Sequence, residues 1–216
     1  MNNNETYRPC DYVNRAKDNQ PKPLTLEYFN TLLDDMNVKF LCDKVRERKP
    51  DAERYKTQLP AVCWQSKFEG QLRTDRNAKP TGLFAIDVDI HHEQTFLDIC
   101  KLKGHEFAYQ WAEAEARRRA GKWADMAKNE DENGVADCSQ ELGIVAVHIS
   151  PSGTGVHVVA CCHFLCKSIA ENQARLARLL DTSYDEVCKD WARIFFVTPR
   201  EDWTYIDTNA IFLENE

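Results

Sequence analysis

The chain has 216 residues, the size of one ordinary domain or of one domain with an elaborate insertion. Hydrophobic residues are 43% and charged residues 29% of it, so it can form a sizeable core, and no apolar run approaches the roughly 18 residues of a membrane span. The net charge of −7 excludes a protein that is basic over its whole surface, although a local basic groove stays compatible with it.

The N-terminal residues indicate a cytoplasmic protein with a loosely held start. The first five residues carry neither the basic patch nor the apolar stretch of a secretory signal. The nine cysteines are odd in number and scattered, so we expect reduced thiols. Residues 1–23 are polar, contain three prolines and show no periodicity, which predicts a flexible arm before a single folded domain at 24–216.

Helices and strands are expected to alternate along that domain. Apolar residues recur at helical spacing after Thr25, a suitable N-cap, and the long helical stretch is broken near Gly104. The expected helices cover 26–36, 38–48, 93–128 and 170–180. The expected strands cover 61–64, 83–90, 143–149, 156–162 and 194–197. This alternation predicts a mixed α/β domain of the α+β class.

The first unusual feature is a pair of acids on an apolar strand. Asp87 and Asp89 are two residues apart, so on a strand they point to one face with Cα atoms roughly 6.6 Å apart. Carboxylates that close repel each other, and a cation such as Mg²⁺ or Mn²⁺ relieves the repulsion. The alternative is that the strand runs into a polar loop where both acids are solvated.

The second feature is the turn Ser150-Pro-Ser-Gly-Thr-Gly155, followed by Val156 and His157. Its glycines allow the backbone to approach an anion closely with exposed N–H groups, and the histidine can donate to a phosphate oxygen. The turn lacks the Gly-Lys-Ser/Thr ending of a Walker loop. The alternative is an ordinary glycine hairpin with an incidental histidine.

The third feature combines acids with an arginine near the C-terminus. Asp181 follows two leucines, and Arg193 begins an apolar segment; they are candidates for a third metal ligand and a phosphate contact. Asp190 is the second candidate for the third ligand, although an ion pair with Arg193 explains it more simply. Asp207 is a late candidate, and Asp185 is expected to be solvated. Helix capping and a surface ion pair are the alternative explanation.

In this order, the three features resemble the motifs of the archaeo-eukaryotic primase (primase–polymerase) superfamily. The matching segments are Ile86-Asp-Val-Asp89, Ser152-Gly-Thr-Gly-Val-His157 and Leu180-Asp181. The chain looks most like primase-like domains of bacterial mobile elements and phages, including the VirE-type N-terminal domain. Those domains also have counterparts of Leu59-Pro-Ala-Val62 and Thr81-Gly-Leu83. The resemblance covers residues 55 to 210.

The resemblance implies a primase catalytic core, in which an RRM-like sheet flanked by helices packs with a second small α/β unit. It implies template-directed nucleotidyl transfer by a DNA primase or polymerase, with two Mg²⁺ or Mn²⁺ ions. The implied catalytic residues, which are also the metal ligands, are Asp87, Asp89 and Asp181. The implied nucleotide-binding residues are Ser150, Ser152, Gly153, Gly155, His157 and Arg193. Implied partners are a single-stranded DNA template or primer, a dNTP or NTP and a replicative helicase, with no membrane.

Some features depart from the resemblance or leave alternatives open. The long spacing between the first two motifs predicts a helical insertion at 104–142. The cluster Cys161-Cys162-His163 with Cys166 favours core cysteines over a zinc site. Basic runs at 44–56 and 117–122 are candidates for template binding or simply solvated helix faces. A DNA- or partner-binding module without activity, an Asp-x-Asp glycosyltransferase and a metal nuclease are the other candidate functions.

Overall fold

The larger of the two main sheets carries the first two motifs. In the computed structural model, which describes residues 10–130 and 140–212, its four antiparallel strands lie in the order β10-β7-β8-β6. These strands are β6 (Leu83–Asp89), β7 (Ile144–Ile149), β8 (Gly155–Cys161) and β10 (Trp203–Ile206). With its helices, this sheet confirms the predicted mixed α+β class.

A smaller sheet is built from segments far apart in the sequence. Its order is β2-β1-β3-β9, and a separate two-stranded sheet pairs β4 with β5. The strands are β1 (Asp11–Val13), β2 (Lys22–Pro23), β3 (Ala61–Cys63), β4 (Ser66–Lys67), β5 (Lys79–Pro80) and β9 (Phe195–Phe196). The prediction of a flexible arm over 1–23 is therefore wrong for residues 10–23. They contain a buried strand that pairs with β3 on one side and β2 on the other. Residues 1–9 lie outside the described part.

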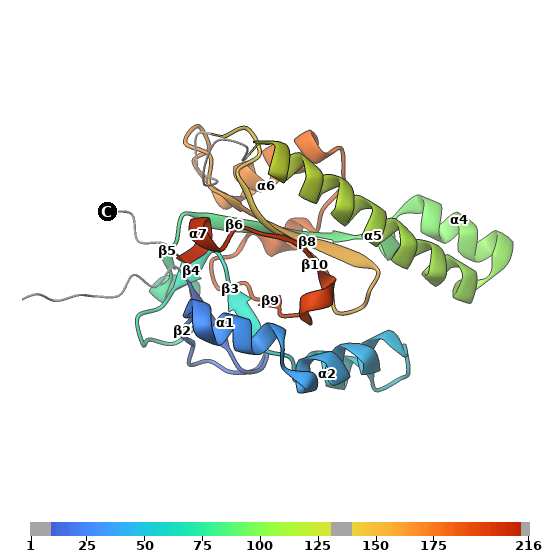
Figure 1. Ribbon diagram of the computed structural model, residues 1–216, viewed down its shortest axis with the longest axis horizontal. Helices are drawn as coiled ribbons and strands as arrows, with labels where there is room; N and C mark the ends of the chain where they lie inside the picture. Colours follow the sequence, from blue (N-terminus) through green and yellow to red (C-terminus); the bar gives the residue numbers. More distant parts are fainter. Residues whose placement is uncertain (1–9, 131–139, 213–216) are drawn as a thin grey trace, which may run out of the picture.

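Helices cover the larger sheet on both sides. Figure 1 shows α5 and α6 on one side of it and α1, α2 and the smaller sheet on the other. The α-helices are α1 (Leu26–Leu33), α2 (Met36–Arg46), α3 (Ala52–Lys56), α4 (Gln94–Lys103), α5 (His105–Glu130), α6 (Ile169–Leu180) and α7 (Thr208–Phe212). Single 3₁₀ turns are η1 (Asp75–Asn77), η2 (Ile90–His92), η3 (Glu186–Lys189) and η4 (Arg200–Asp202).

The helix expected within 104–142 is α5, and it forms part of the core. Ala112, Ala116 and Ala120 recur every four residues on one face and are fully buried. Such small side chains let the helix lie close to the sheet. Whether this helix is an insertion relative to the primases that the motifs resemble stays a prediction, and residues 131–139 lie outside the described part. No helix in the described segments is long and apolar enough to cross a membrane.

The alternation of side chains along β6 places the acids between the two layers. Ile86 and Val88 pack with the alanines of α5. Ala85, on the opposite face, packs into the cluster that contains α1, α2 and the smaller sheet. Asp87 and Asp89 continue the face of Ala85, because residues two apart on a strand point the same way. The end of β6 therefore directs both carboxylates into the space between the layers.

Candidate active site

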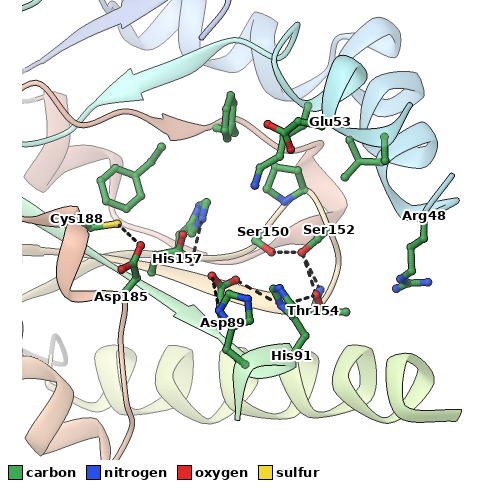
Figure 2. A pocket seen from close by; sticks show the side chains of 18 of the residues that line it. Arg48, Glu53, Asp89, His91, Ser150, Ser152, Thr154, His157, Asp185 and Cys188 are labelled. Carbon is green, nitrogen blue, oxygen red and sulfur yellow. Dashed lines mark hydrogen bonds and ion pairs between the residues drawn. The ribbon is translucent and has the colours of Figure 1, made fainter. Parts of the chain in front are cut away.

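A cleft of about 570 Å³ opens where the two layers diverge. Its walls are the ends of β6 and β8, the turn at 150–154, the segment from the end of α2 through α3, and residues 185–196. Figure 2 shows polar side chains from all of these elements directed into this space. The first two sequence motifs therefore meet in one cavity.

Pairing between β6 and β8 fixes the relation between the acids and the second motif. Asp87 lies opposite His157, and Asp89 lies opposite Gly155. The His157 Nε2 atom is 3.4 Å from Asp87 Oδ1, which is longer than a good hydrogen bond. His157 is buried, and its ring packs edge-on against those of His148 and Phe195.

The two carboxylates have pKa values shifted in opposite directions. Burial raises the pKa of Asp87, but the nearby His157 outweighs burial and leaves that pKa below its ordinary value. Burial and the charge of Asp87 raise the pKa of Asp89. The negative charge of Asp87 thus destabilises the ionised form of Asp89. A cation bound between them would stabilise both ionised carboxylates.

The turn at 150–155 presents a row of hydroxyl groups. The Ser152 Oγ atom lies 3.0 Å from Ser150 Oγ and 3.0 Å from Thr154 Oγ1. Gly153 has a φ of +78°, which suits glycine. A Cβ on Gly155 would lie 2.9 Å from the Val88 carbonyl oxygen and 3.2 Å from Asp89 Oδ1. Glycine is thus required for the turn to approach the acids this closely.

The structure does not bring Asp181 to the cleft, so its assignment as third ligand is corrected. It is exposed at the end of α6 in a left-handed conformation with a φ of +53°. Asp185, expected to be solvated, lines the cleft instead. Its backbone N–H donates to the Asp87 carbonyl oxygen at 2.8 Å, and its carboxylate caps η3 by accepting from Val187 N–H at 2.9 Å.

Cationic groups reach the cleft from two sides. Arg193 lines it, as expected, and is held by Asp190 at 3.0 Å, the local pair that the spacing had predicted. Lys56, at the end of α3, also lines the cleft and lies near both carboxylates of β6. In the other basic run, Arg119 pairs with Glu93 and Glu115, so the segment at 117–122 is partly neutralised.

Two histidines that the sequence analysis did not assign lie beside the second acid. His91 and His92 form the 3₁₀ turn that follows β6, and each places its Nδ1 atom 3.7 Å from an oxygen of Asp89. Burial lowers the pKa of His91 to about 4, with a further contribution from His92. The sequence signal was present, because the two histidines follow the Asp-x-Asp motif after one residue.

The donor atoms around Asp87 fit a hard divalent cation. Its Oδ1 atom is buried and accepts no hydrogen bond from any described residue. His157 Nε2, at 3.4 Å, makes only a long contact with it. A buried carboxylate oxygen without a hydrogen bond costs free energy unless a cation or water satisfies it. Carboxylate oxygens are also the ligands that Mg²⁺ and Mn²⁺ prefer.

Comparisons of the chain with family models, with curated proteins and with solved structures found no match. The resemblance to primases therefore stays a prediction from the motifs. Independently of it, the described residues define a cleft with two carboxylates at one wall, a row of hydroxyls beside them and cations facing them. Such a combination suits a phosphorylated substrate together with a divalent cation.

Proposed function

We propose that this chain is a template-directed nucleotidyltransferase, a DNA primase or polymerase of the primase–polymerase type. The observation that carries the proposal is the register of β6 against β8. It places Asp87 opposite His157 and Asp89 opposite Gly155. Groups suited to a cation and groups suited to a triphosphate thereby share one cleft, as this reaction requires.

Asp87 and Asp89 would hold Mg²⁺ or Mn²⁺, and Asp185 is the further carboxylate at the same cleft. A bound divalent ion supplies charge neutralisation at the reacting phosphate and lowers the pKa of an attacking hydroxyl. The low pKa of Asp87 keeps that carboxylate ionised near neutral pH, as a metal ligand must be.

The triphosphate would bind along the turn at 150–155. The hydroxyls of Ser150, Ser152 and Thr154 already form a chain of hydrogen bonds and can turn their protons toward phosphate oxygens. Lys56 and Arg193 add positive charge at the opposite wall. His157 directs Nε2 at Asp87, so besides the phosphate contact inferred from the motif it holds that carboxylate in place.

The direct test is incorporation of labelled dNTPs or NTPs on a primed single-stranded DNA template, with Mg²⁺ or Mn²⁺. We expect metal-dependent, template-directed extension with at least one nucleotide set. Parallel reactions with UDP-sugars test the glycosyltransferase alternative. Binding of the primed template with no incorporation under any of these conditions would overturn the proposal and favour a module that only binds DNA.

A further inference from the structure

Asp89, His91 and His92 form a compact set of possible metal ligands. One donor atom from each lies within 4.8 Å of the others. His91 Nδ1 faces Asp89 Oδ1 and His92 Nδ1 faces Asp89 Oδ2, both at 3.7 Å. The two rings lie side by side with their centroids 4.1 Å apart. Two neighbouring histidines thus turn toward the same carboxylate.

The distances suit a shared ion better than hydrogen bonds. A separation of 3.7 Å is too long for a hydrogen bond between imidazole and carboxylate. A single ion about 2.1 Å from each donor atom can span it. Asp87, two residues earlier on the same face of β6, adds a second negative charge nearby, which further favours a cation here.

The ligand types distinguish between metals. Mg²⁺ takes oxygen ligands, whereas imidazole nitrogen suits transition metals such as Co²⁺, Ni²⁺ and Zn²⁺. His91 is half-buried and its Nδ1 also lies 3.3 Å from the Thr154 hydroxyl. That hydroxyl has Ser152 Oγ as another partner at 3.0 Å, so His91 can ligate an ion without leaving Thr154 unsatisfied.

We propose that Asp89, His91 and His92 bind one divalent transition-metal ion in preference to Mg²⁺. The inference rests on the proposed function to the extent that Asp89 belongs to both sites. It names the metal class of the position that Asp89 forms with the two histidines. It needs no nucleotide or template, and metal binding alone tests it.

The experiment is a titration of the full chain, stripped of metal with a chelator, using Co²⁺ as the probe. The visible absorption of bound Co²⁺ reports nitrogen ligands, and calorimetry measures Mg²⁺ in parallel. The test variant is His91→Asn with His92→Asn, which keeps polar side chains but removes both imidazoles. His105→Asn, at an exposed histidine that begins α5, is the matched control.

We expect the wild type to bind Co²⁺ more tightly than Mg²⁺. The double variant should lose Co²⁺ affinity by on the order of 10-fold or more. Removing even a residue that only hydrogen-bonds to a metal ligand lowers metal affinity by that much. Its Mg²⁺ affinity should be unchanged, and the control should match the wild type. Since the His92 side chain is 71% exposed, His92→Asn alone gives the same readout if the double variant does not fold.

A folded double variant with wild-type Co²⁺ affinity would overturn the inference, as would a wild type that binds Mg²⁺ as tightly as Co²⁺. The proposed function fails separately. If the chain binds Co²⁺ through the histidines but incorporates no nucleotide, the metal-site inference stands and the proposed polymerase function is wrong.

Discussion

Asp87 and Asp89 have pKa values shifted in opposite directions because their surroundings differ. His157 lies 3.4 Å from Asp87, whereas Asp89 is partly buried and faces the charge of Asp87. Without a bound metal, the ionised form of Asp89 therefore destabilises the folded state. The same repulsion makes the pair receptive to a cation.

The substitution Asp89→Asn should stabilise the metal-free protein at neutral pH. Because the folded-state pKa of Asp89 is raised, its ionisation opposes folding at pH values above that pKa. The gain from Asn should shrink as the pH falls through the raised pKa and vanish below the ordinary value of 3.8. Urea unfolding with a chelator across this pH range measures it. An Asp181→Asn control should show no such gain, and a gain that grows toward low pH would contradict the assignment.

The substitution His157→Ala should weaken nucleotide binding by about 1.5–3 kcal/mol, the range for a hydrogen bond to a charged group. Affinity for the template should hardly change, because the side chain is buried at the floor of the cleft. Fluorescence titration with a labelled nucleotide, and separately with labelled template, distinguishes the two. An unchanged nucleotide Kd would leave His157 with only its structural contact to Asp87.

The first two motifs were predictable from sequence because each is local. Asp87 and Asp89 follow from strand alternation, and the turn at 150–155 follows from its glycines. The preference for Asp181 over Asp185 depended on a hydrophobic-Asp pattern, but only Asp185 lines the cleft. Leu180 is buried, but the helix ends there, and the next residue turns outward in a left-handed conformation. Asp185 reaches the cleft through a backbone contact with Asp87, which connects segments nearly one hundred residues apart.

Short strands without a clear apolar pattern of their own were the hardest elements to predict. β1 has three residues between polar segments, and its pairing partner β3 lies about 50 residues later. β10 pairs with β7 across a similar separation and was not expected at all. Short strands of this kind are stabilised by cross-strand contacts more than by their own propensity. The long helices and β6, β7 and β8, whose apolar patterns are local, were predicted within a few residues.

The contact between β8 and β6 at Gly155 has little tolerance for a side chain. A Cβ there would lie 2.9 Å from the Val88 carbonyl oxygen and 3.0 Å from Ser150 Oγ. We expect Gly155→Ala to destabilise the protein by about 1–3 kcal/mol, the usual cost of overpacking. It should also weaken metal binding, because Asp89 must move. Thermal unfolding and a Mn²⁺ titration measure the two effects.

Gly121→Ala is the matched control for that substitution. Gly121 lies within α5, and a Cβ there would have no neighbour within 4 Å. Alanine should stabilise the helix by about 0.5–1 kcal/mol and leave metal binding unchanged. If both glycine variants behaved alike, the close approach of β8 to the acids would not be the cause.

Arg46 ties the two layers together beside the cleft. This residue of α2 pairs with Asp202 at 2.5 Å and donates to the Pro151 carbonyl oxygen at 3.3 Å. The Asp202 side chain is only 1% exposed, and burial raises its pKa despite the neighbouring guanidinium of Arg46. The layer that carries α2 and the layer that carries the second motif thus share a buried charge pair.

Arg46→Ala should cost about 3 kcal/mol of stability, because it leaves the buried Asp202 carboxylate without its main partner. Urea unfolding at neutral pH measures the loss. Arg200→Ala, which breaks an ion pair with Asp34 at the surface, should have a much smaller effect. Equal effects of the two substitutions would mean that the buried pair does not hold the layers together.

The central claim is tested most directly by measuring primer extension with three variants, each carrying one Asp→Asn substitution. Asp87→Asn should reduce metal-dependent incorporation by at least about 10³-fold, which corresponds to roughly 4 kcal/mol of transition-state stabilisation. Asp185→Asn should also reduce it, whereas Asp181→Asn, at an exposed helix end outside the cleft, should extend primers at the wild-type rate. Wild-type extension by a folded Asp87→Asn protein would contradict the assignment of this cleft as a nucleotidyltransferase site.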